Sequence, residues 1–258
     1  MLPISQDIPR LALVTGGAKR LGRGIALALA SAGFDVAIHH NTSAAEAAAL
    51  AAEISAMGRR AATFGADLMH EGEVAALLPA VAAAMGVVGV LVNNASTFER
   101  DEWHDATRSG WDHHMEPNLR APFVLMQEFA RALPAGRQGA VVNMIDQRVL
   151  SLTPHFVTYT VSKAGLWALT RQMALALAPS IRVNAIGPGP AMPSPRQTQA
   201  QFERQCASVP LGRGTSGPEV AEAVLALIAL PSVTGQILNL DGGQHLQWSP
   251  AHGAVPDE

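Results

Sequence analysis

The chain has 258 residues, of which 48% are hydrophobic and 15% charged, a balance that excludes a disordered polypeptide and allows one large domain with a buried core. The formal net charge of −3 provides no basic surplus, so neither nucleic acid nor an acidic membrane surface is expected as a partner. A single cysteine, Cys206, excludes an internal disulfide, and with no signal peptide or membrane-spanning run expected, the sequence predicts a cytoplasmic protein.

Short, almost continuously apolar runs alternate along the chain with longer stretches of helical periodicity. The expected strands are Leu11–Thr15, Asp35–His40, Ala61–Ala66, Val87–Asn93, Ala140–Ile145, Ile181–Ile186 and Gln236–Leu240. The expected helices include Gly22–Ser31, Ser43–Met57, Glu73–Ala84, Pro117–Leu133, Tyr159–Leu177, Gln197–Val209 and Pro218–Leu230. Strands without polar alternation are covered by helices on both faces, so we expect an α/β fold with a doubly wound parallel sheet of about seven strands.

A glycine-rich turn joins the first strand to the first helix and reads Thr15-Gly16-Gly17-Ala18-Lys19-Arg20-Leu21-Gly22. Glycine lets a backbone approach a pyrophosphate closely, and the helix that follows offers free N–H groups and the positive end of its dipole. In this strand–turn–helix context the motif predicts a dinucleotide site. The guanidinium of Arg20 either reaches a phosphate or an anionic substrate or is simply solvated at a helix start.

The second strand ends in His40-Asn41-Thr42-Ser43 and carries no acidic residue there. Sites that prefer NAD usually place Asp or Glu at this point to hold the ribose 2′-hydroxyl, and an acid would repel a 2′-phosphate. The polar groups present, with Lys19 and Arg20 close by in the loop, therefore favour NADP(H). Capping of the next helix by Thr42 or Ser43 is an interpretation that is compatible with this one.

Tyr159 and Lys163 are spaced to lie on one face of a helix, and Tyr159 is the only tyrosine of the chain. A neighbouring ammonium stabilises a phenolate and makes the tyrosine hydroxyl a better proton donor. The fifth strand ends at Asp146 ahead of this pair, and Asn118 lies in the preceding helix. The sequence thus predicts a proton-delivery site for hydride-transfer chemistry.

Proline and glycine concentrate in Gly187–Pro195, after the sixth strand. A loop of this length in a compact domain is interpreted as a substrate lid rather than a plain surface connection. We therefore expect a single dinucleotide-binding and catalytic domain over 1–258, with a core at 10–243 and a substrate loop at 187–210. The tail at 244–258 either reaches the pocket of a neighbouring subunit or is disordered.

These motifs resemble, in order, those of the short-chain dehydrogenase/reductase family, from about Leu11 to Gly243. The resemblance implies a Rossmann-type fold, a homotetramer packed through two long helices and the last strand, and the catalytic set Asn118, Asp146, Tyr159 and Lys163. Asp146 occupies the family's usual serine position, and Arg20 occupies the place of a middle glycine. A serine hydroxyl can donate to a carbonyl, whereas an ionised carboxylate cannot.

Within the family, the turn from Thr15 to Gly22, the stretch from Asn94 to Phe98 and the acid at Asp146 resemble the pteridine reductase branch. The resemblance implies a flat pterin ring stacked on Phe98, although a purely structural core aromatic is an equal alternative. The expected substrate contacts are Arg20, Ser96, Phe98, Asp146 and Tyr159. The expected cofactor contacts are Thr15, Gly16, Lys19, Arg20, Leu21, Gly22, His40, Asn41, Thr42, Ser43, Asp67, Leu68, Asn94, Ala95, Ser96, Tyr159, Lys163, Pro188 and Gly189.

The function expected from these features is NADPH-dependent reduction of C=N bonds in pterins, such as dihydropterins or dihydrofolate-like compounds, without a metal. Tyr159 is expected to supply the proton, Asp146 to orient the pterin amino group or relay a proton from water, and Asn118 to hold a water linking Lys163 to solvent. The alternatives are a carbonyl or 3-oxoacyl reductase of the same family and, from another class, a non-catalytic NADP(H)-binding regulator.

Overall fold

The computed structural model describes residues 3–194 and 196–247. Seven parallel strands form one sheet in the order β3-β2-β1-β4-β5-β6-β7. They are β1 (Leu11–Val14), β2 (Asp35–His40), β3 (Ala61–Gly65), β4 (Val90–Asn93), β5 (Gly139–Met144), β6 (Ile181–Pro188) and β7 (Ile237–Leu240). The predicted doubly wound sheet is confirmed, and its strand order reverses between β1 and β4, where such folds bind ligands.

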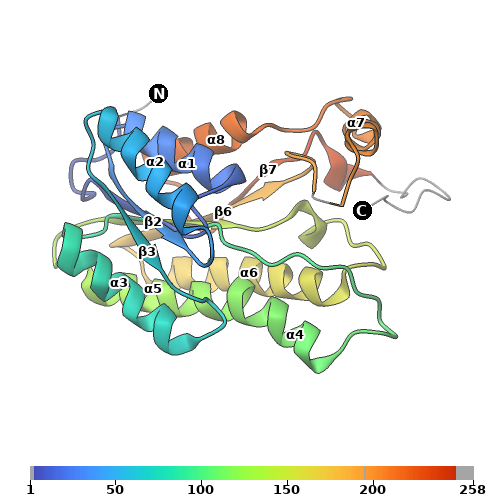
Figure 1. The fold of residues 1–258 in the computed structure, drawn as a ribbon, viewed down its shortest axis with the longest axis horizontal. Coiled ribbons are helices and arrows are strands. Elements are labelled where there is room, and N and C mark those ends of the chain that lie inside the picture. Colours follow the sequence, from blue (N-terminus) through green and yellow to red (C-terminus); the bar gives the residue numbers. More distant parts are fainter. Residues whose placement is uncertain (1–2, 195, 248–258) are drawn as a thin grey trace.

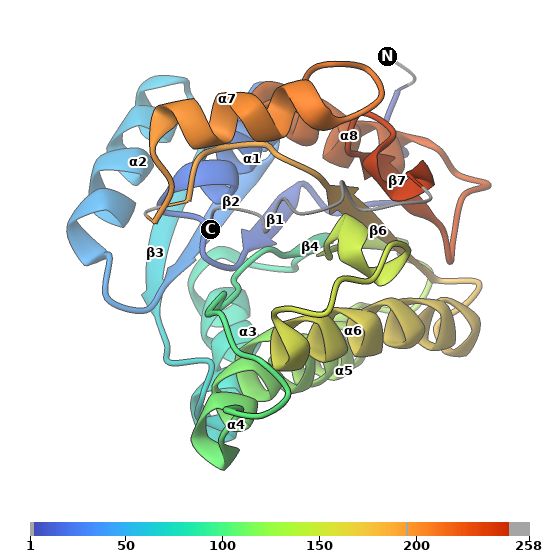
Figure 2. The same ribbon diagram turned by 90° about the vertical axis from the view of Figure 1, so that its right-hand side faces the viewer.

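Helices cover both faces of this sheet (Figure 1). On one face lie α1 (Arg20–Ser31), α2 (Ala44–Ala56) and α8 (Gly217–Ala229). On the other lie α3 (Glu71–Met85), α4 (Arg108–Met115), α5 (Ala121–Ala132) and α6 (Val157–Ala176). Figure 2 shows α7 (Gln199–Ser208) lying over the carboxyl-terminal side of the sheet. Across the described segments, no helix combines the length and hydrophobicity that crossing a bilayer requires.

The apolar character of the strands follows from burial on both sides. In β1, Ala12 and Val14 pack into the hydrophobic cluster formed with α1 and α8, whereas Leu11 and Leu13 pack into the one formed with α3 and α5. All four side chains are buried. Successive side chains of a strand point to opposite faces of the sheet, and here both faces pack against helices. Neither face is left for polar residues, so the strand sequence is apolar throughout.

Three elements differ from the expectation. The helix expected at 117–133 begins as a π-helical turn, Glu116–Arg120, and becomes α-helical only in α5. The expected strand at 87–93 begins at Val90 because Gly86, with φ of 104°, ends α3 and turns the chain. Helix α4 was not predicted, since it is short and polar; Thr107 caps it by accepting from the N–H of Gly110.

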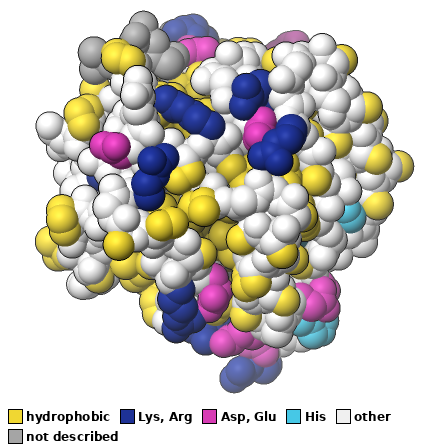
Figure 3. Space-filling model, turned by 90° about the vertical axis from the view of Figure 1, so that its left-hand side faces the viewer, with side chains coloured by type: hydrophobic (Ala, Val, Ile, Leu, Met, Phe, Trp, Pro, Cys, Tyr) yellow, Lys and Arg dark blue, Asp and Glu magenta, His cyan; other side chains and the backbone are white. Residues whose placement is uncertain are grey.

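The face opposite the ligand side carries mixed charge (Figure 3). Basic side chains lie there beside acidic ones, rather than in a field of one sign. Asp35, at the start of β2, pairs with Arg59 at 2.9 Å and with Arg60 at 2.8 Å. This arrangement lowers the pKa of Asp35 even though its partial burial opposes ionisation. Such pairs neutralise the arginines locally.

The expected tail at 244–258 lies mostly outside the described residues, which end at Gln247. The described part forms a short 3-10 turn, Gln244–Leu246, and the Gln247 side chain donates to the carbonyl of Ser208 at 2.7 Å. This bond ties the end of the described chain to the end of α7.

Candidate active site

The glycine-rich turn is held tightly against the end of β4. The hydroxyl of Thr15 accepts from the N–H groups of Asn94 at 2.9 Å and Ala95 at 3.0 Å. Gly16 has φ of 58°, and a Cβ on it would lie 3.0 Å from the Cα of Ala95. A Cβ on Gly22 would lie 2.2 Å from the carbonyl oxygen of Gly16. Only glycine fits these two positions, so the turn presents bare backbone at the start of α1.

The N-terminus of α1 fits a pyrophosphate. No side chain caps it at Lys19, and its first turn carries no acidic residue. The positive end of the helix dipole therefore meets no anion from its own first turn. Arg20, in place of the usual glycine, adopts φ of 51° and so takes the backbone conformation that glycine would have.

The Arg20 side chain contacts the loop that follows β6. Its guanidinium donates to the carbonyls of Pro193 at 3.0 Å and Met192 at 3.4 Å. Arg20 and Met192 both line the cavity that contains Tyr159, so the Arg20 side chain connects the glycine-rich turn with that cavity.

The ends of β2 and β3 carry the remaining residues expected to contact cofactor. Asn41 and Thr42 are exposed and Ser43 is half-buried, and none is acidic, as the 2′-phosphate interpretation requires. The ammonium of Lys19 lies 2.7 Å from Glu46 in the first turn of α2, which also lowers the pKa of Glu46. A 2′-phosphate here would therefore meet Lys19 together with its acidic partner.

Sequence reasoning missed His39, which is buried and organises this end of the site. Its Nδ1 accepts from the N–H of Gly16 at 3.0 Å, so Nε2 carries the proton and donates to the carbonyl of Ala66 at 3.0 Å. Burial lowers the pKa of His39 to about 4, and the ring is neutral at physiological pH. The signal was available, because a histidine inside a buried strand requires two polar partners.

Tyr159 and Asp146 meet at the carboxyl end of β5. The phenol of Tyr159 donates to the carboxylate of Asp146 at 3.0 Å. Arg148, in the short 3-10 turn Gln147–Val149, donates its backbone N–H to the other oxygen, Oδ1, at 2.8 Å. Its guanidinium lies 3.4 Å from Oδ2, the oxygen that accepts from Tyr159. The carboxylate is thus oriented from two sides, with one oxygen facing the phenol.

Lys163 lies one helical turn after Tyr159 and is almost fully buried. Its ammonium donates to the carbonyl of Met144 at 2.9 Å and lies 5.8 Å from the Tyr159 ring centroid. Burial lowers the pKa of Lys163 to about 8, although Asp146 opposes the shift. The group therefore changes charge close to neutrality, where it can modulate the phenol.

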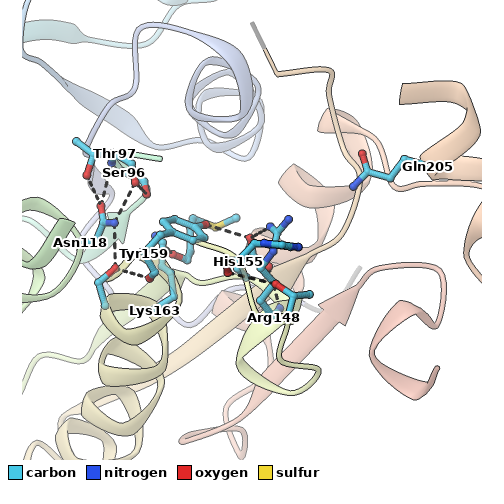
Figure 4. Close-up of polar contacts among 12 residues, drawn as sticks. Ser96, Thr97, Asn118, Arg148, His155, Tyr159, Lys163 and Gln205 are labelled. Atoms are coloured by element: carbon cyan, nitrogen blue, oxygen red, sulfur yellow. Dashed lines mark hydrogen bonds and ion pairs between the residues drawn. The ribbon is translucent and has the colours of Figure 1, made fainter. Parts of the chain in front are cut away.

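Asn118, in the π-helical turn, lies beside Tyr159 (Figure 4). Its amide donates to the carbonyl of Thr97 at 3.0 Å and to Ser162 at 3.1 Å, and its oxygen accepts from the N–H of Thr97 at 2.9 Å. Ser162 in turn donates to the carbonyl of Tyr159 at 2.7 Å. The side chain thus joins the segment after β4 to the helix that carries Tyr159 and Lys163.

An aromatic wall faces the cavity. The ring of Phe98 stacks on Phe156, with centroids 4.8 Å apart and planes 6° apart, and contacts the edge of Tyr159 at 4.7 Å. The guanidinium of Arg148 lies 5.6 Å from the Phe98 centroid. Phe156 itself is buried with φ of 57°, a strained conformation held in place by the surrounding packing.

A cavity of about 270 Å³ is lined by Phe98, Asp146, Arg148, Tyr159 and Lys163 among others. Gln205 faces it from α7, across from Tyr159 (Figure 4). Of the expected site residues, the cavity brings together Arg20, Leu21, Asn94, Ser96, Phe98, Asp146, Tyr159, Lys163, Pro188 and Gly189. Other expected residues lie outside its lining: Thr15, Gly16, Lys19, Gly22 and Ala95 in and behind the glycine turn, Asn118 next to Ser162, and His40, Asn41, Thr42, Ser43, Asp67 and Leu68 toward the ends of β2 and β3.

The chain is similar to known reductases over most of its length. A family model described as enoyl-(acyl carrier protein) reductase matches residues 16–245. A 3-oxoacyl-[acyl-carrier-protein] reductase from Staphylococcus aureus is 30% identical over 91% of the chain and 98% of its own length. Pteridine reductase 1 from Leishmania tarentolae is 34% identical over 92% of the chain and 96% of its own length.

Two solved structures are similar to this chain over most of its length. The FolM alternative dihydrofolate reductase 1 from Brucella canis, complexed with NADP, has a TM-score of 0.92 and 44% identity, covering 97% of this chain and 100% of its own. The protein of the same description from Brucella suis, also with NADP, has a TM-score of 0.90 and 46% identity, covering 94% and 98%. The sequence-based expectation of the family is confirmed: the chain is an oxidoreductase of the short-chain dehydrogenase/reductase family.

Proposed function

We propose that the enzyme is an NADPH-dependent reductase of pterins that acts on C=N bonds of dihydropterin or dihydrofolate-like substrates. The observation that supports this most is the 3.0 Å hydrogen bond between Tyr159 and Asp146 beside the Phe98 ring. A carboxylate accepts from an amino group or ring N–H, and a flat aromatic wall suits a flat heterocycle. Pteridine reductase 1 and the FolM proteins are relatives whose names point to the same substrate class.

The residues present fit NADPH. The bare turn at Gly16 and Gly22 takes the pyrophosphate, and the acid-free end of β2 takes the 2′-phosphate. When bound, NADPH supplies the hydride, which is added to the carbon of the C=N bond. Tyr159 transfers its hydroxyl proton to the adjacent ring nitrogen, while the Lys163 ammonium stabilises the phenolate left behind. Asp146 holds the pterin amino group or relays a proton from water.

A 3-oxoacyl reductase is the alternative that a specific observation favours. The Staphylococcus aureus relative carries that name, and a Tyr159–Lys163 pair also suits a ketone. Asp146 disfavours this alternative because its carboxylate cannot donate to a substrate carbonyl. A non-catalytic NADP(H)-binding regulator is disfavoured by the intact Tyr159–Lys163 pair.

The test is a substrate screen followed by loss of NADPH absorbance, with dihydrobiopterin, dihydrofolate and an acetoacetyl ester. We expect turnover with the pterins, and a loss of about 100-fold or more in kcat for Tyr159→Phe. Asp146→Ala is expected to reduce pterin turnover as well. Turnover of the oxoacyl ester alone, or full activity in both variants, would overturn the proposal.

The same proposal extends to the loop and the assembly. Residues 187–210 are proposed to cover the cavity, an arrangement supported by the Arg20 bonds to Met192 and Pro193 and by an ion pair of 2.6 Å between Arg196 and Glu99. A cytoplasmic homotetramer is proposed on family resemblance and the single cysteine, and light scattering on the purified chain tests the tetramer.

A further inference from the structure

His114 is a buried titratable group with no part in the proton transfer described above. It lies on α4, which sequence reasoning did not predict, and only 1% of its surface is exposed. Helix α4 runs beside α6, the helix that carries Tyr159 (Figures 1 and 2). The His114 ring meets the edge of the Tyr159 ring with centroids 5.9 Å apart.

The hydrogen bonds of His114 have a defined direction. The backbone N–H of Glu99 donates to Nε2 at 3.0 Å, so Nε2 carries a lone pair and the proton is on Nδ1. Nδ1 lies 2.7 Å from the hydroxyl of Thr158 and therefore donates to it. That hydroxyl donates to the carboxylate of Asp101. The chain of donors runs from Glu99 through His114 and Thr158 to Asp101 and is complete only with a neutral ring.

This chain ties two parts of the site together. Glu99 and Asp101 belong to the segment after β4, and Thr158 belongs to the first turn of α6. Asp101 also accepts from the backbone N–H of Thr158 at 3.2 Å, and its carbonyl accepts from the N–H of Phe156 at 2.9 Å. Phe98 directly precedes Glu99, so a bond at the Glu99 N–H fixes the backbone from which the Phe98 ring projects.

We propose that His114 is a positioning residue for the substrate cavity, which as a neutral ring holds the Glu99 N–H and so keeps Phe98 against Tyr159. The inference rests on the proposed pterin site, because Phe98 is the wall on which the substrate ring would stack. His114 touches neither substrate nor cofactor; it acts through Phe98. Loss of its acceptor is therefore a loss of substrate binding rather than of cofactor binding.

Protonation of His114 removes this acceptor. Burial lowers its pKa below the usual range, and His113 on the same helix lowers it further, whereas Asp101 and Glu99 of the segment after β4 oppose the shift. Tyr159 is the titratable group that faces it from α6. The ring is therefore neutral at neutral pH, and the Glu99 bond is lost only as the pH falls through the pKa of His114.

Two substitutions of His114 distinguish the role of Nε2 from that of Nδ1. His114→Gln keeps an acceptor near the Nε2 position and so keeps the Glu99 bond, whereas His114→Asn keeps only the Nδ1 position. We expect His114→Asn to raise the KM for the dihydropterin about tenfold, with the KM for NADPH changed less than about twofold. His114→Gln is expected to stay within about threefold of the native enzyme for both. The matched control is His113→Asn, on the neighbouring position of α4, which is expected to leave both constants unchanged.

The pH profile is the second readout. The KM for the dihydropterin is expected to rise at acidic pH in the native enzyme more than in His114→Gln, which has no group to protonate. Equal KM values for the Asn and Gln variants, an equal rise in the KM for NADPH, or superimposable profiles would each overturn the proposal.

A substrate-independent measurement keeps this test apart from that of the proposed function. Nitrogen chemical shifts of ¹⁵N-histidine-labelled enzyme are expected to show His114 at neutral pH with its proton on Nδ1. A proton on Nε2, or on both nitrogens, would overturn the positioning role whatever the substrate is. If the native enzyme reduced only an oxoacyl ester, the pterin proposal would fail, and the same KM comparison with that ester would still decide the role of His114.

Discussion

At the scale of a single residue, Lys163 is expected to set an upper pH limit on catalysis. Its pKa of about 8 means that the ammonium is present below pH 8 and is lost as the pH rises through that value. Since the ammonium stabilises the phenolate, kcat/KM is expected to fall above about pH 8. Asp146 opposes the downward shift, so Asp146→Asn is expected to move this decline to lower pH.

The measurement is kcat/KM as a function of pH for the native and Asp146→Asn enzymes, each profile normalised to its own maximum. Asp112→Asn is the matched control, because it removes a carboxylate paired with Arg108 on the surface. A decline that stayed in place or moved to higher pH in Asp146→Asn would contradict the assignment of this limb to Lys163.

Arg20 has a backbone conformation that favours glycine, and two substitutions separate its backbone from its side chain. Both Arg20→Gly and Arg20→Ala lose the bonds to the Met192 and Pro193 carbonyls. Of the two variants, only the glycine variant adopts the φ of 51° without steric strain. Chemical denaturation is therefore expected to give a free energy of unfolding about 1 kcal/mol higher for the glycine variant than for the alanine variant. Equal stabilities would show that the position carries no strain.

At the scale of elements, the contact between α5 and β5 leaves no room at Gly139. A Cβ there would lie 2.8 Å from Cε1 and 2.9 Å from Cζ of the buried Phe129 ring. Gly139→Ala is expected to lower the free energy of unfolding by about 1–3 kcal/mol through overpacking. Gly72→Ala, on α3 with open space around it, is expected to raise it slightly. Denaturation midpoints that failed to move in opposite directions would contradict this account.

The strands could be predicted because each is a short, almost continuous apolar run, and α1, α6 and α8 because each shows helical periodicity. The π-helical turn and α4 could not. Asn118 lies where the helix winding changes, and a local winding change leaves no trace in hydrophobic periodicity. Helix α4 is polar and short, so its packing on α6 depends on the buried His114, whose partners are far away in the chain.

Those site residues that belong to short motifs could be predicted from the sequence, whereas those that act through contacts distant in the chain could not. Motif spacing identified the Tyr159–Lys163 pair, the Asp146 carboxylate and the glycine turn. It gave no indication of Phe156, which stacks on Phe98 from a separate segment of the chain. Such residues become visible only when the sheet has brought the ends of its strands together.

At the scale of the whole molecule, the strand order reverses between β1 and β4, where a cofactor is expected to bind. A ligand at 100 times its Kd adds about 2.7 kcal/mol to the free energy of unfolding. NADPH is therefore expected to raise the melting temperature of the native enzyme, and more than NADH does at the same concentration. Gly22→Ala is expected to abolish the rise because its Cβ would fill the turn.

Gly24→Ala is the matched control for this prediction. It adds the same methyl group on the same helix, where the nearest atom is the Gly217 carbonyl oxygen at 3.8 Å. Differential scanning fluorimetry with and without each dinucleotide measures the shifts. A Gly22→Ala enzyme that NADPH stabilises as much as the native one would exclude this turn as the pyrophosphate site.

The hydrogen bond between Tyr159 and Asp146 also has a consequence for selectivity. It sets a donor and an acceptor side by side, a hydrogen-bonding edge comparable to that of a nucleobase. A heterocycle with an amino group next to a ring nitrogen can bond to both groups, whereas a ketone accepts from the phenol and offers no donor to the carboxylate, which then keeps only its contacts with Arg148. A hydrogen bond to a charged group contributes about 1.5–3 kcal/mol, a discrimination of about 10- to 150-fold. The Asp146 carboxylate would then make the enzyme select pterins over oxoacyl substrates. Asp146→Ser is expected to lower the ratio of kcat/KM for a dihydropterin to kcat/KM for an acetoacetyl ester.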